Sequence, residues 1–326
     1  LAPMSEAPDV LFCSDLFAAG ERARLAAIAP DVELMEMVDG VELDDGQLGR
    51  ITLAHFSHDV WPDRAAPFFG VVLRAPNLRW LHTMSAGVDS PVFAGLLERG
   101  VRLSNSSGSS APPIARTALM YLLALSRDLP SMLHSQERRE WNWHRWDELE
   151  GRSVAVVGWG PIGQEFARLA EAIGMQPTAV RRAAHGDESV PVRRLDELVD
   201  VAKDHDAMVV ALPLTDDTDG LIGRDVLDAL GPDGFFVNVG RGELVDQAAL
   251  AAALTDGRLG GAGIDVTVPE PLPADDPLWA APNLILTPHN SGSTDGTSQR
   301  ATDTFFANLE SWVDGERLTT EVRASR

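Results

Sequence analysis

A buried strand that runs directly into a glycine-rich turn and a helix is the feature that most constrains how this chain can fold. Residues 153–157 form a short, continuous apolar run, the pattern of a strand buried on both faces. The turn carries glycines at positions 158, 160 and 163, and apolar residues at helical spacing follow until Gly174 stops the helix. A strand of this kind belongs to a parallel sheet with helices on both faces, because parallel strands are joined by crossover helices.

The alternation of strand and helix continues through the second half of the chain. Further strands are expected at residues 177–181, 207–212, 235–239, 262–266 and 284–287. Helical patterns separate several of them, notably over residues 224–230 and 246–255. Between about residues 151 and 290 the sequence therefore predicts a doubly wound, mainly parallel α/β fold of the Rossmann type.

The first part of the chain predicts a second α/β unit with weaker patterns, and 326 residues suffice for two domains. Its strands are expected at residues 10–13, 32–37, 78–83 and 101–103, and its helices at residues 21–29 and 91–99. A long helix over residues 114–136 is expected to bridge the two units. An aromatic segment, 141–146, follows it, and a last helix is expected over residues 297–312.

Charge is the most unusual aspect of the composition. The formal net charge is −22, and Lys203 is the only lysine among 27 basic residues. An acidic surface repels nucleic acid and anionic membranes, so neither is expected as a partner. Residues 1–9 lack the pattern of a signal peptide, and the single cysteine, Cys13, lies in an apolar run and fits a reducing compartment. We therefore expect a cytoplasmic protein.

The glycine turn predicts a dinucleotide site. In this context Gly158 permits the tight turn, Gly160 lets the backbone approach a pyrophosphate, and Gly163 allows close packing of helix and strand. The start of the helix then offers N–H groups and a positive dipole end to the phosphates. A glycine turn that packs and binds nothing is the alternative, which the strand–turn–helix context disfavours.

The end of the next strand indicates which dinucleotide is bound. Selection of NAD needs a carboxylate about 20 residues after the turn, but this chain has Arg181 and Arg182 there and no acid until Asp187. Two guanidinium groups suit a 2′-phosphate, to which they can make charge-assisted, bidentate hydrogen bonds. Arginines at a strand end are often only solvated charge. On so acidic a chain, however, they indicate a preference for NADP, with NAD possible as well.

Polar residues that follow three of the later strands can supply the chemistry of a 2-keto or 2-hydroxy acid. The carboxyl ends of the strands are where such sheets bind ligands, so these segments can converge on the nicotinamide half of the cofactor. Arg241 offers a planar cation for a carboxylate and its neighbouring carbonyl. His289 is the best proton donor, because histidine titrates near neutral pH, and Glu270 can orient its imidazole. Each is more often structural when taken singly, but together with a phosphate-binding turn they indicate catalysis. No metal ion is expected.

These segments together resemble the D-isomer-specific 2-hydroxyacid dehydrogenase family, in particular its glyoxylate/hydroxypyruvate reductase-like members. The resemblance covers nearly the whole chain and implies hydride transfer between NAD(P) and a small 2-keto or 2-hydroxy acid. It also implies Arg241, Glu270 and His289 as the catalytic residues. The matching segments are residues 158–163, 212–215 with Thr218, 238–246, 265–271 and 288–292, and in the first unit 85–89 and 105–108.

The resemblance implies further roles and a division into domains. A flavodoxin-like α/β substrate-binding domain would comprise residues 1–112 and 293–326, and the dinucleotide-binding Rossmann domain residues 113–292. Asp265 would lie near the nicotinamide amide. The substrate-binding residues would be Ser57, the N–H groups of Ala86, Gly87 and Val88, and Arg241 with His289. The cofactor-binding residues expected from the turn, the arginine pair and the matching segments are Gly158, Trp159, Gly160, Pro161, Ile162, Gly163, Arg181, Arg182, Leu212, Pro213, Thr218, Asn238, Val239, Gly240, Asp265 and Gly292.

Family members are commonly dimers, so we expect a homodimer with contacts near the first helices of the cofactor domain. Trp141 or Trp143 could reach a partner's substrate pocket, although packing in the core or an interface is the simpler interpretation. Arg116 stands where many relatives carry glutamate, at the start of a helix expected beside the nicotinamide. The fine contacts to cofactor and substrate there are left open.

The main alternative is a nucleotide-sensing interaction protein, like the corepressors that share this fold and can retain the same catalytic residues. The absence of long disordered flanks counts against it. Phosphoglycerate dehydrogenase is disfavoured because few positive charges await a substrate phosphate, and formate dehydrogenase because Glu270 and the histidine segment indicate a keto-acid reductase. A glyoxylate- or hydroxypyruvate-like acid is the favoured substrate, while the exact acid and the physiological direction are left open.

Overall fold

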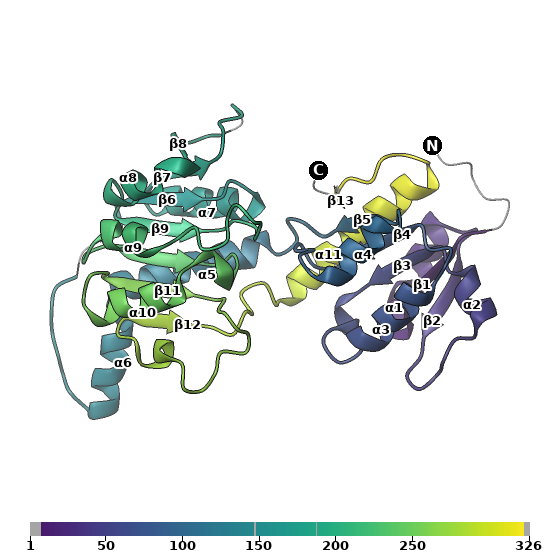
Figure 1. Ribbon diagram of the computed structural model, residues 1–326, viewed down its shortest axis with the longest axis horizontal. Helices are drawn as coiled ribbons and strands as arrows, with labels where there is room; N and C mark the ends of the chain where they lie inside the picture. Colours follow the sequence, from purple (N-terminus) through teal and green to yellow (C-terminus); the bar gives the residue numbers. More distant parts are fainter. Residues whose placement is uncertain (1–7, 147, 187, 323–326) are drawn as a thin grey trace. The chain divides into compact units, whose positions relative to one another are not determined.

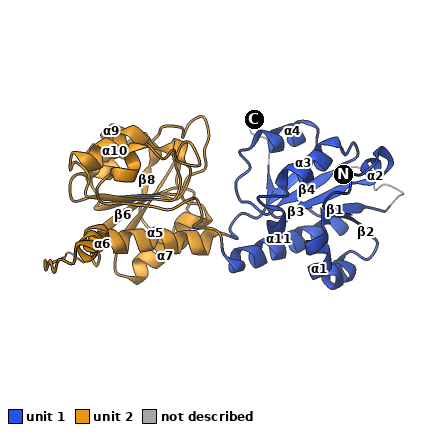
Figure 2. Cartoon of the chain, turned by 90° about the horizontal axis from the view of Figure 1, so that it is seen from below, with its two compact units in different colours: residues 1–109, 294–326 blue, residues 110–293 orange. Residues whose placement is uncertain are grey.

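The computed structural model describes residues 8–146, 148–186 and 188–322, so the expectations that rest on residues 1–7 and on Asp187 lie outside the described residues. The chain divides into two compact units, with residues 1–109 and 294–326 in unit 1 and residues 110–293 in unit 2 (Figure 2). The sequence places the first boundary after residue 112 and the second after residue 292.

Unit 2 is built on a parallel sheet that, in its described residues, has seven strands in the order β12-β11-β10-β9-β6-β7-β8 (Figure 1). The order reverses between β6 and β9, and doubly wound sheets bind ligands at such a reversal, outside the carboxyl ends of the strands. The predicted Rossmann-type fold is therefore confirmed. The strands are β6 (Ser153–Val157), β7 (Gln176–Arg181), β8 (Val192–Arg194), β9 (Ala207–Val210), β10 (Phe235–Asn238), β11 (Gly261–Ile264) and β12 (Leu284–Leu286).

Helices cover both faces of this sheet, because successive strand residues point to opposite sides. Phe236 packs into the core on one face with Leu227 of α9 and Leu250 of α10. Its neighbour Val237 packs into the core on the other face with Tyr121 of α5 and others. The helices of unit 2 are α5 (Ala111–Ser126), α6 (Leu129–Arg138), α7 (Pro161–Ala172), α8 (Leu198–Lys203), α9 (Arg224–Leu230) and α10 (Gln247–Thr255), with short 3₁₀ turns η2 (Leu195–Glu197), η3 (Gly242–Leu244) and η4 (Pro277–Ala280).

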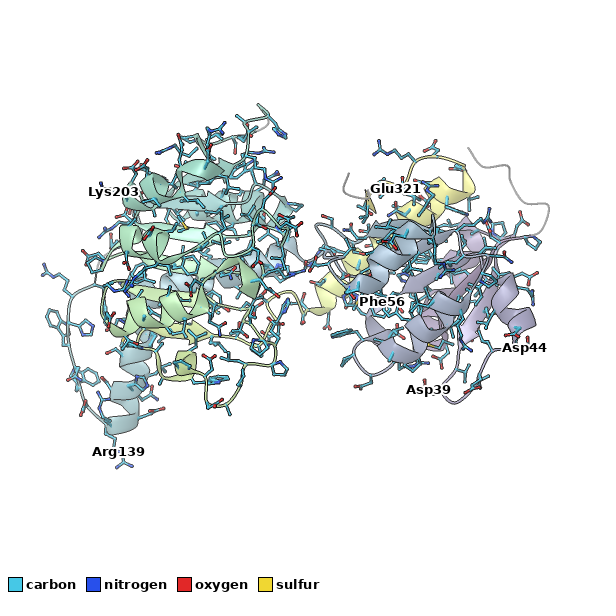
Figure 3. The ribbon with its side chains drawn as sticks, in the orientation of Figure 1. Asp39, Asp44, Phe56, Arg139, Lys203 and Glu321 are labelled. Carbon is cyan, nitrogen blue, oxygen red and sulfur yellow. The ribbon has the colours of Figure 1, made fainter. Side chains whose placement is uncertain are left out.

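The single long helix predicted over residues 114–136 is wrong, because the chain breaks it into α5 and α6. Asp128 has a φ of 46°, a left-handed conformation that no α-helix continues through. Pro130 then falls in the first turn of α6, where its missing N–H costs nothing. Helix α6 extends away from the sheet (Figure 1) and ends at Arg138; its C-cap residue, Arg139, is labelled in Figure 3.

The described residues of unit 1 form a sheet of six strands in the order β13-β5-β4-β3-β1-β2. Its five parallel strands have the order 2-1-3-4-5, which is flavodoxin-like, as predicted. The sequence missed β3, where His55 interrupts the apolar run. The elements are β1 (Val10–Ser14), β2 (Glu33–Met37), β3 (Leu53–Phe56), β4 (Trp80–Thr83), β5 (Arg102–Asn105), β13 (Glu321–Val322), α1 (Asp15–Ile28), α2 (Asp45–Arg50), η1 (His58–Val60), α3 (Ala65–Arg74), α4 (Pro91–Glu98) and α11 (Asp295–Val313).

The C-terminal part of the chain completes unit 1. Phe305 and Leu309 of α11 lie in the same buried cluster as Phe17 and Trp80. Strand β13 pairs antiparallel with β5, and Glu321 accepts a hydrogen bond of 2.6 Å from Nε of Arg102. Among the described residues, no helix combines the length and apolar character needed to cross a lipid bilayer.

Candidate active site

The glycine turn after β6 has the geometry that a pyrophosphate needs. Gly158 has a φ of 109°, and a Cβ added there would lie 2.6 Å from the carbonyl oxygen of Ala211. A Cβ at Gly163 would lie 2.0 Å from the carbonyl oxygen of Gly158, so helix α7 packs tightly on the turn. At Gly160, the N-cap of α7, an added Cβ would meet no atom within 4 Å. The helix N-terminus therefore faces an open cradle, which fits the phosphates of a dinucleotide.

The loops at the carboxyl ends of the neighbouring strands touch one another through their backbones. A Cβ added at Gly240 would lie 2.8 Å from the carbonyl oxygen of Leu212, and one at Gly242 would lie 2.3 Å from that of Thr267. Side chains at these two positions would push the loops apart. The loops after β9, β10 and β11 thus form one continuous edge that begins at the glycine turn.

Two of the expected cofactor residues use their side chains to build these loops. The Asn238 side chain donates to the carbonyl oxygen of Arg241 over 2.8 Å and accepts the N–H of Gly240 over 3.0 Å. Thr218 accepts the N–H of Thr215 over 2.8 Å and donates to the carbonyl oxygen of Pro213 over 2.9 Å. Both side chains are buried, so what they present toward the edge of the sheet is shaped backbone.

The remaining expected cofactor residues lie along the same edge of unit 2. Trp159 and Val239 are buried, and the indole Nε1 of Trp159 has no hydrogen-bond partner among the described residues. Pro161 is the first residue of α7, and Ile162, the second, packs against the core. Gly292 lies beside the start of α5, where an added Cβ would be 3.3 Å from the Cβ of Ser110.

His289 and Glu270, which the sequence proposes as a pair, lie in direct contact. Nδ1 of His289 is 2.7 Å from Oε2 of Glu270, while Oε1 of Glu270 accepts the N–H of Thr267 over 3.1 Å. Both carboxylate oxygens are therefore engaged, which fixes the carboxylate and, through it, the imidazole. The His289 side chain is 47% exposed, so the opposite ring edge, with Nε2, remains accessible within unit 2.

The backbone of His289 is held in an unusual conformation by Asp265. His289 has a φ of 49°, which costs a residue other than glycine roughly 1–2 kcal/mol. Its N–H donates to the Asp265 carbonyl oxygen over 2.7 Å. The buried Asp265 carboxylate accepts the N–H groups of Asn290 (3.1 Å) and Ser291 (3.0 Å) and the hydroxyl of Thr287 (2.5 Å). Asp265 therefore acts as the anchor of the turn that carries the histidine.

Arg241 follows β10, the strand next to β11, and is half-buried. Its Nη1 donates to the Gly240 carbonyl oxygen over 2.9 Å, which draws the guanidinium back over its own loop. Arg241, Glu270 and His289 thus follow three adjacent strands, β10, β11 and β12, at one edge of the sheet. The structure joins the last two by a hydrogen bond.

The two arginines at the end of β7 have different surroundings. Nη1 of Arg181 donates over 2.5 Å to Glu188, whose side chain is only 3% exposed. Glu188 also accepts the N–H groups of His185 and Gly186, and these hydrogen bonds lower the pKa of Glu188 to about 2. Arg182 instead pairs with Asp217 over 2.9 Å at the surface, where both side chains are more than half exposed. The sequence analysis missed Glu188, although an acid seven residues after the first arginine could have signalled a closed loop.

In unit 1, the carbonyl groups of residues 85–87 are all hydrogen-bonded within the unit. The carbonyl oxygens of Ser85, Ala86 and Gly87 are bonded by the N–H of Ser106 (3.1 Å), the side chain of Asn105 (2.7 Å) and the hydroxyl of Ser85 (2.9 Å) respectively. A trans peptide points its N–H away from its carbonyl. The N–H groups of Ala86, Gly87 and Val88 therefore face away from these three partners.

The other expected substrate residue, Ser57, follows β3 in unit 1. It is buried, and its hydroxyl donates to Oδ1 of Asp59 over 2.6 Å. Its hydrogen is therefore used within its own loop.

The sequence of the chain is similar to those of known dehydrogenases. Residues 119–291 match the family described as D-isomer specific 2-hydroxyacid dehydrogenase, NAD binding domain. The chain is 34% identical over 250 residues to glyoxylate/hydroxypyruvate reductase A of Arabidopsis thaliana, which covers 76% of this chain and 79% of that protein. The chain belongs to the D-isomer specific 2-hydroxyacid dehydrogenase family. It is an NAD(P)-dependent oxidoreductase of that family, as its motifs predicted.

Solved structures of the family are similar over nearly the whole chain. A D-isomer specific 2-hydroxyacid dehydrogenase family protein from Aeromonas salmonicida has a TM-score of 0.80 and 31% identity, with 97% of this chain and 99% of that chain covered. An NADPH-dependent glyoxylate/hydroxypyruvate reductase from Sinorhizobium meliloti, in complex with NADP and malonate, has a TM-score of 0.74 and 25% identity, with 98% and 100% covered.

Arg116 is exposed on helix α5 of this dehydrogenase. The hydrogen bond from Arg168 lowers the pKa of Glu165 on α7, and the charge of Arg116 adds a smaller effect in the same direction. Arg116 also borders a shallow groove with Leu119, Met120 and Leu123 on the outer face of α5. Its charge therefore acts on the α5–α7 surface.

Proposed function

We propose that this dehydrogenase reduces small 2-keto acids at C2 to D-2-hydroxy acids, with NADPH as the preferred reductant. Glyoxylate- and hydroxypyruvate-like acids are the proposed substrates, in keeping with the names of the relatives. The observation that carries the proposal is the 2.7 Å hydrogen bond between Glu270 and His289, one strand away from Arg241 at the carboxyl edge of the sheet. A proton donor held by a carboxylate beside a planar cation is the set that carbonyl reduction of a keto acid needs.

Each residue of the set has a distinct role in the proposed reaction. Arg241 binds the substrate carboxylate and polarises the neighbouring carbonyl through its planar guanidinium. Glu270 holds Nδ1 of His289 and stabilises the positive charge of the protonated ring, so that Nε2 gives its proton to the carbonyl oxygen as the alcohol forms. The nicotinamide, when bound, supplies the hydride to C2. In the reverse direction His289 takes the proton back.

The second part of the substrate site is proposed for unit 1, as the substrate-binding domain. The N–H groups of Ala86, Gly87 and Val88 form a backbone nest for the substrate carboxylate. Ser57 shapes the wall of the pocket with its loop and does not donate to the substrate, because Asp59 holds its hydroxyl.

The cofactor is proposed to bind unit 2, as the dinucleotide-binding domain, at the turn from Gly158 to Gly163. Arg182 is the main contact for a 2′-phosphate, because its exposed pair with Asp217 is worth at most about 1 kcal/mol and is easily exchanged. Arg181 supports the loop through Glu188. Asp265 is proposed to bond the nicotinamide amide, and the backbones of residues 212–213, 238–240 and Gly292 to line the rest of the cofactor site.

We further propose that the protein is a cytoplasmic homodimer. Apolar side chains are exposed on two consecutive helices of unit 2, namely Met120, Leu123, Leu129 and Leu133. Contiguous apolar surface of this kind marks an interface. Trp141 and Trp143 are 97% and 80% exposed, so neither packs in the core of this chain, and both are proposed to contact the partner subunit. The single cysteine, Cys13, is a buried free thiol, as proteins of reducing compartments have.

Oxidation of NADPH and NADH, measured against glyoxylate, hydroxypyruvate, pyruvate and bulkier 2-keto acids, tests the proposed reaction. We expect turnover of the small acids with a higher kcat/KM for NADPH than for NADH. His289→Ala and Arg241→Ala are each expected to lower kcat/KM by at least about a hundredfold, because each removes charge stabilisation or proton transfer in the transition state.

His205→Ala and Arg258→Ala serve as matched controls, since these residues follow the C-terminal ends of α8 and α10 and precede β9 and β11, at the amino edge of the sheet. Both variants should retain wild-type activity. A near-normal kcat/KM in His289→Ala or Arg241→Ala contradicts the assigned roles. A lack of turnover with every acid, together with capture of a protein partner that depends on nucleotide, would instead favour the corepressor-like alternative.

A further inference from the structure

A chain of hydrogen bonds runs from helix α5 to the turn that carries His289, and it includes Tyr121, the single tyrosine of the sequence. The phenol oxygen of Tyr121 is hydrogen-bonded to the hydroxyl of Thr287, and that hydroxyl is 2.5 Å from Oδ1 of Asp265. Tyr121 lies in none of the sequence motifs that resemble the family, and the sequence alone assigned no role to it or to Thr287. All three residues belong to unit 2.

The direction of these hydrogen bonds follows from the groups involved. An ionised carboxylate only accepts, so the single hydrogen of the Thr287 hydroxyl is donated to Asp265. The Thr287 oxygen is then left as an acceptor, and Tyr121 must be the donor to it. Burial raises the pKa of Tyr121 to about 12, which keeps its phenol protonated as a donor throughout the neutral range.

The residues packed around Tyr121 leave room for its aromatic ring. The side chain is fully buried on the inner face of α5. A Cβ added at Gly263 in β11 would lie 2.4 Å from Cγ of the ring, so the absence of a side chain at Gly263 makes room for it. The ring therefore packs against the sheet, and its hydroxyl lies at hydrogen-bonding distance from Thr287, the residue after β12.

Beyond Asp265, the chain of bonds reaches the backbone of the proposed proton donor. The carboxylate that receives Thr287 on Oδ1 also receives the N–H of Asn290 there, and Oδ2 receives that of Ser291. The carbonyl oxygen of Asp265 receives the N–H of His289. Three successive N–H groups therefore donate to one residue, whose Oδ1 also accepts the hydroxyl of Thr287.

We propose that Tyr121 and Thr287 are positioning residues, which act in series to hold the Asp265 carboxylate and thereby the turn that aims His289 at the substrate. This inference rests on the proposed role of His289 as the proton donor. Since Thr287 touches Asp265 directly and Tyr121 acts through Thr287, loss of the threonine hydroxyl has the larger effect. Once the Thr287 hydroxyl is removed, no hydrogen bond connects the Tyr121 hydroxyl with Asp265 or the turn.

The experiment compares Thr287→Val, which removes the hydroxyl at nearly constant volume, with Thr287→Ser, which keeps it. Amide hydrogen exchange of the peptide that covers residues 288–293 is measured first, because it reports on the turn without any turnover. We expect Thr287→Val to speed exchange of the amides of His289, Asn290 and Ser291 by about tenfold or more. Thr287→Ser should exchange like the wild type. Thr255→Val is the matched control, since the Thr255 hydroxyl bonds only a helix carbonyl, that of Ala251.

Steady-state kinetics with NADPH and a 2-keto acid form the second readout. Thr287→Val is expected to lower kcat about tenfold, with KM for the acid changed less than about twofold, because a displaced proton donor affects the chemical step more than binding. Tyr121→Phe should lower kcat about two- to threefold in the wild type. In the Thr287→Val background the same change should lower it no further, as expected of residues that act in series.

The outcomes separate this inference from the proposed function. Wild-type exchange and wild-type kcat in Thr287→Val overturn the inference, as does an equal loss in Thr287→Ser. So does a full further loss on adding Tyr121→Phe to Thr287→Val. If the wild type reduces no 2-keto acid while the exchange pattern is as expected, the positioning of the turn stands and the proposed reaction fails. Should Thr287→Val not fold, Tyr121→Phe is compared with the wild type in hydrogen exchange and in kcat. A wild-type exchange rate and a wild-type kcat in Tyr121→Phe would then overturn the inference.

Discussion

Neighbouring residues of the same type can have different roles, as Arg181 and Arg182 at the end of β7 illustrate. Arg181 donates to Glu188, a carboxylate that also closes the loop through two backbone N–H groups. To bind a phosphate, Arg181 would have to leave or share a partner that is withdrawn from solvent. Arg182 has only to exchange the exposed Asp217, and such surface pairs contribute little. At the scale of single residues, the cost of leaving the present partner decides which arginine is available to a ligand.

Cofactor affinity is expected to follow this difference. Arg182→Ala should raise the Kd of NADPH by about tenfold or more, because a charge-assisted contact to the 2′-phosphate is lost, and should leave the Kd of NADH unchanged. Asp217→Asn should have the opposite effect, a fall of about two- to threefold in the Kd of NADPH, since it removes the competing charge. Fluorescence titration of both variants with both cofactors measures these values. Equal changes for NADH and NADPH, or no change in either variant, would count against Arg182 as the phosphate contact.

Helices α5 and α6 show how elements of one unit can prepare an interface. One face of α5 packs on the sheet through Ala118, Tyr121 and Leu122, while the other exposes Met120 and Leu123. The break at Asp128 redirects the chain so that α6 leaves the body of unit 2 with Leu133 exposed. A monomer in water gains nothing from such surface, whereas a second subunit can bury it.

A charge placed on this face should keep the subunits apart. Leu123→Glu and Leu133→Glu are each expected to shift the protein from dimer to monomer at micromolar concentration, because dimerisation would then bury an unpaired carboxylate. Sedimentation equilibrium measures the mass of each variant. Val313→Glu, which alters a comparably exposed apolar residue on α11 of unit 1, is the control and should keep the wild-type mass. A monomeric wild-type protein would contradict the proposed dimer. Variants that remain dimeric would show that the interface lies on another surface.

The molecule as a whole carries a strong acidic charge, yet the core of unit 1 holds two histidines that are sensitive to acid. His82 is fully buried between Ser104 and Ser106, and desolvation lowers the pKa of His82 to about 3. Burial likewise lowers the pKa of His55 well below its usual range, and Nδ1 of His55 lacks a hydrogen-bond partner among the described residues. Both rings are stable in the fold only while they are neutral.

The stability of unit 1 is therefore expected to fall as the pH falls. The unfolded chain protonates His82 near pH 6.5 and the folded chain only near pH 3, so the contribution of this group is complete above pH 6.5 and is lost progressively on going down to pH 3. Between pH 7 and pH 5 the loss for His82 is about 2 kcal/mol. His82→Gln should remove that part of the pH dependence of the free energy of unfolding, measured with urea at both pH values. His205→Gln is the control, and an unaltered pH dependence in His82→Gln would contradict the assignment.

Much of this architecture could be predicted because the signals are local. The run from Ser153 to Val157 is buried on both faces and matches β6 residue for residue, and the glycines after it mark their turn by backbone requirements alone. Arg241, Glu270 and His289 follow successive strands, so a parallel sheet brings their segments to one edge whatever the loops do in detail.

The features that the sequence did not reveal depend on contacts between distant segments. Strand β3 contains His55, which is polar in isolation and is buried only because Phe17 and Phe305 pack around it. Glu188 could not be assigned to Arg181 without the loop between them. The role of Tyr121 exists only because Gly263, more than a hundred positions later, leaves space for its ring.

The way in which unit 1 is assembled from both ends of the chain has a consequence for synthesis. Every strand of unit 2 lies between residues 110 and 293, so a ribosome has delivered the complete cofactor half before it has delivered α11 or β13. The earlier part of unit 1, although translated first, still lacks the helix that buries Phe17 and Trp80. The usual order, in which the N-terminal domain matures first, is thus inverted. During translation the nascent chain keeps an unfinished N-terminal half that exposes apolar surface, the kind of segment that chaperones protect.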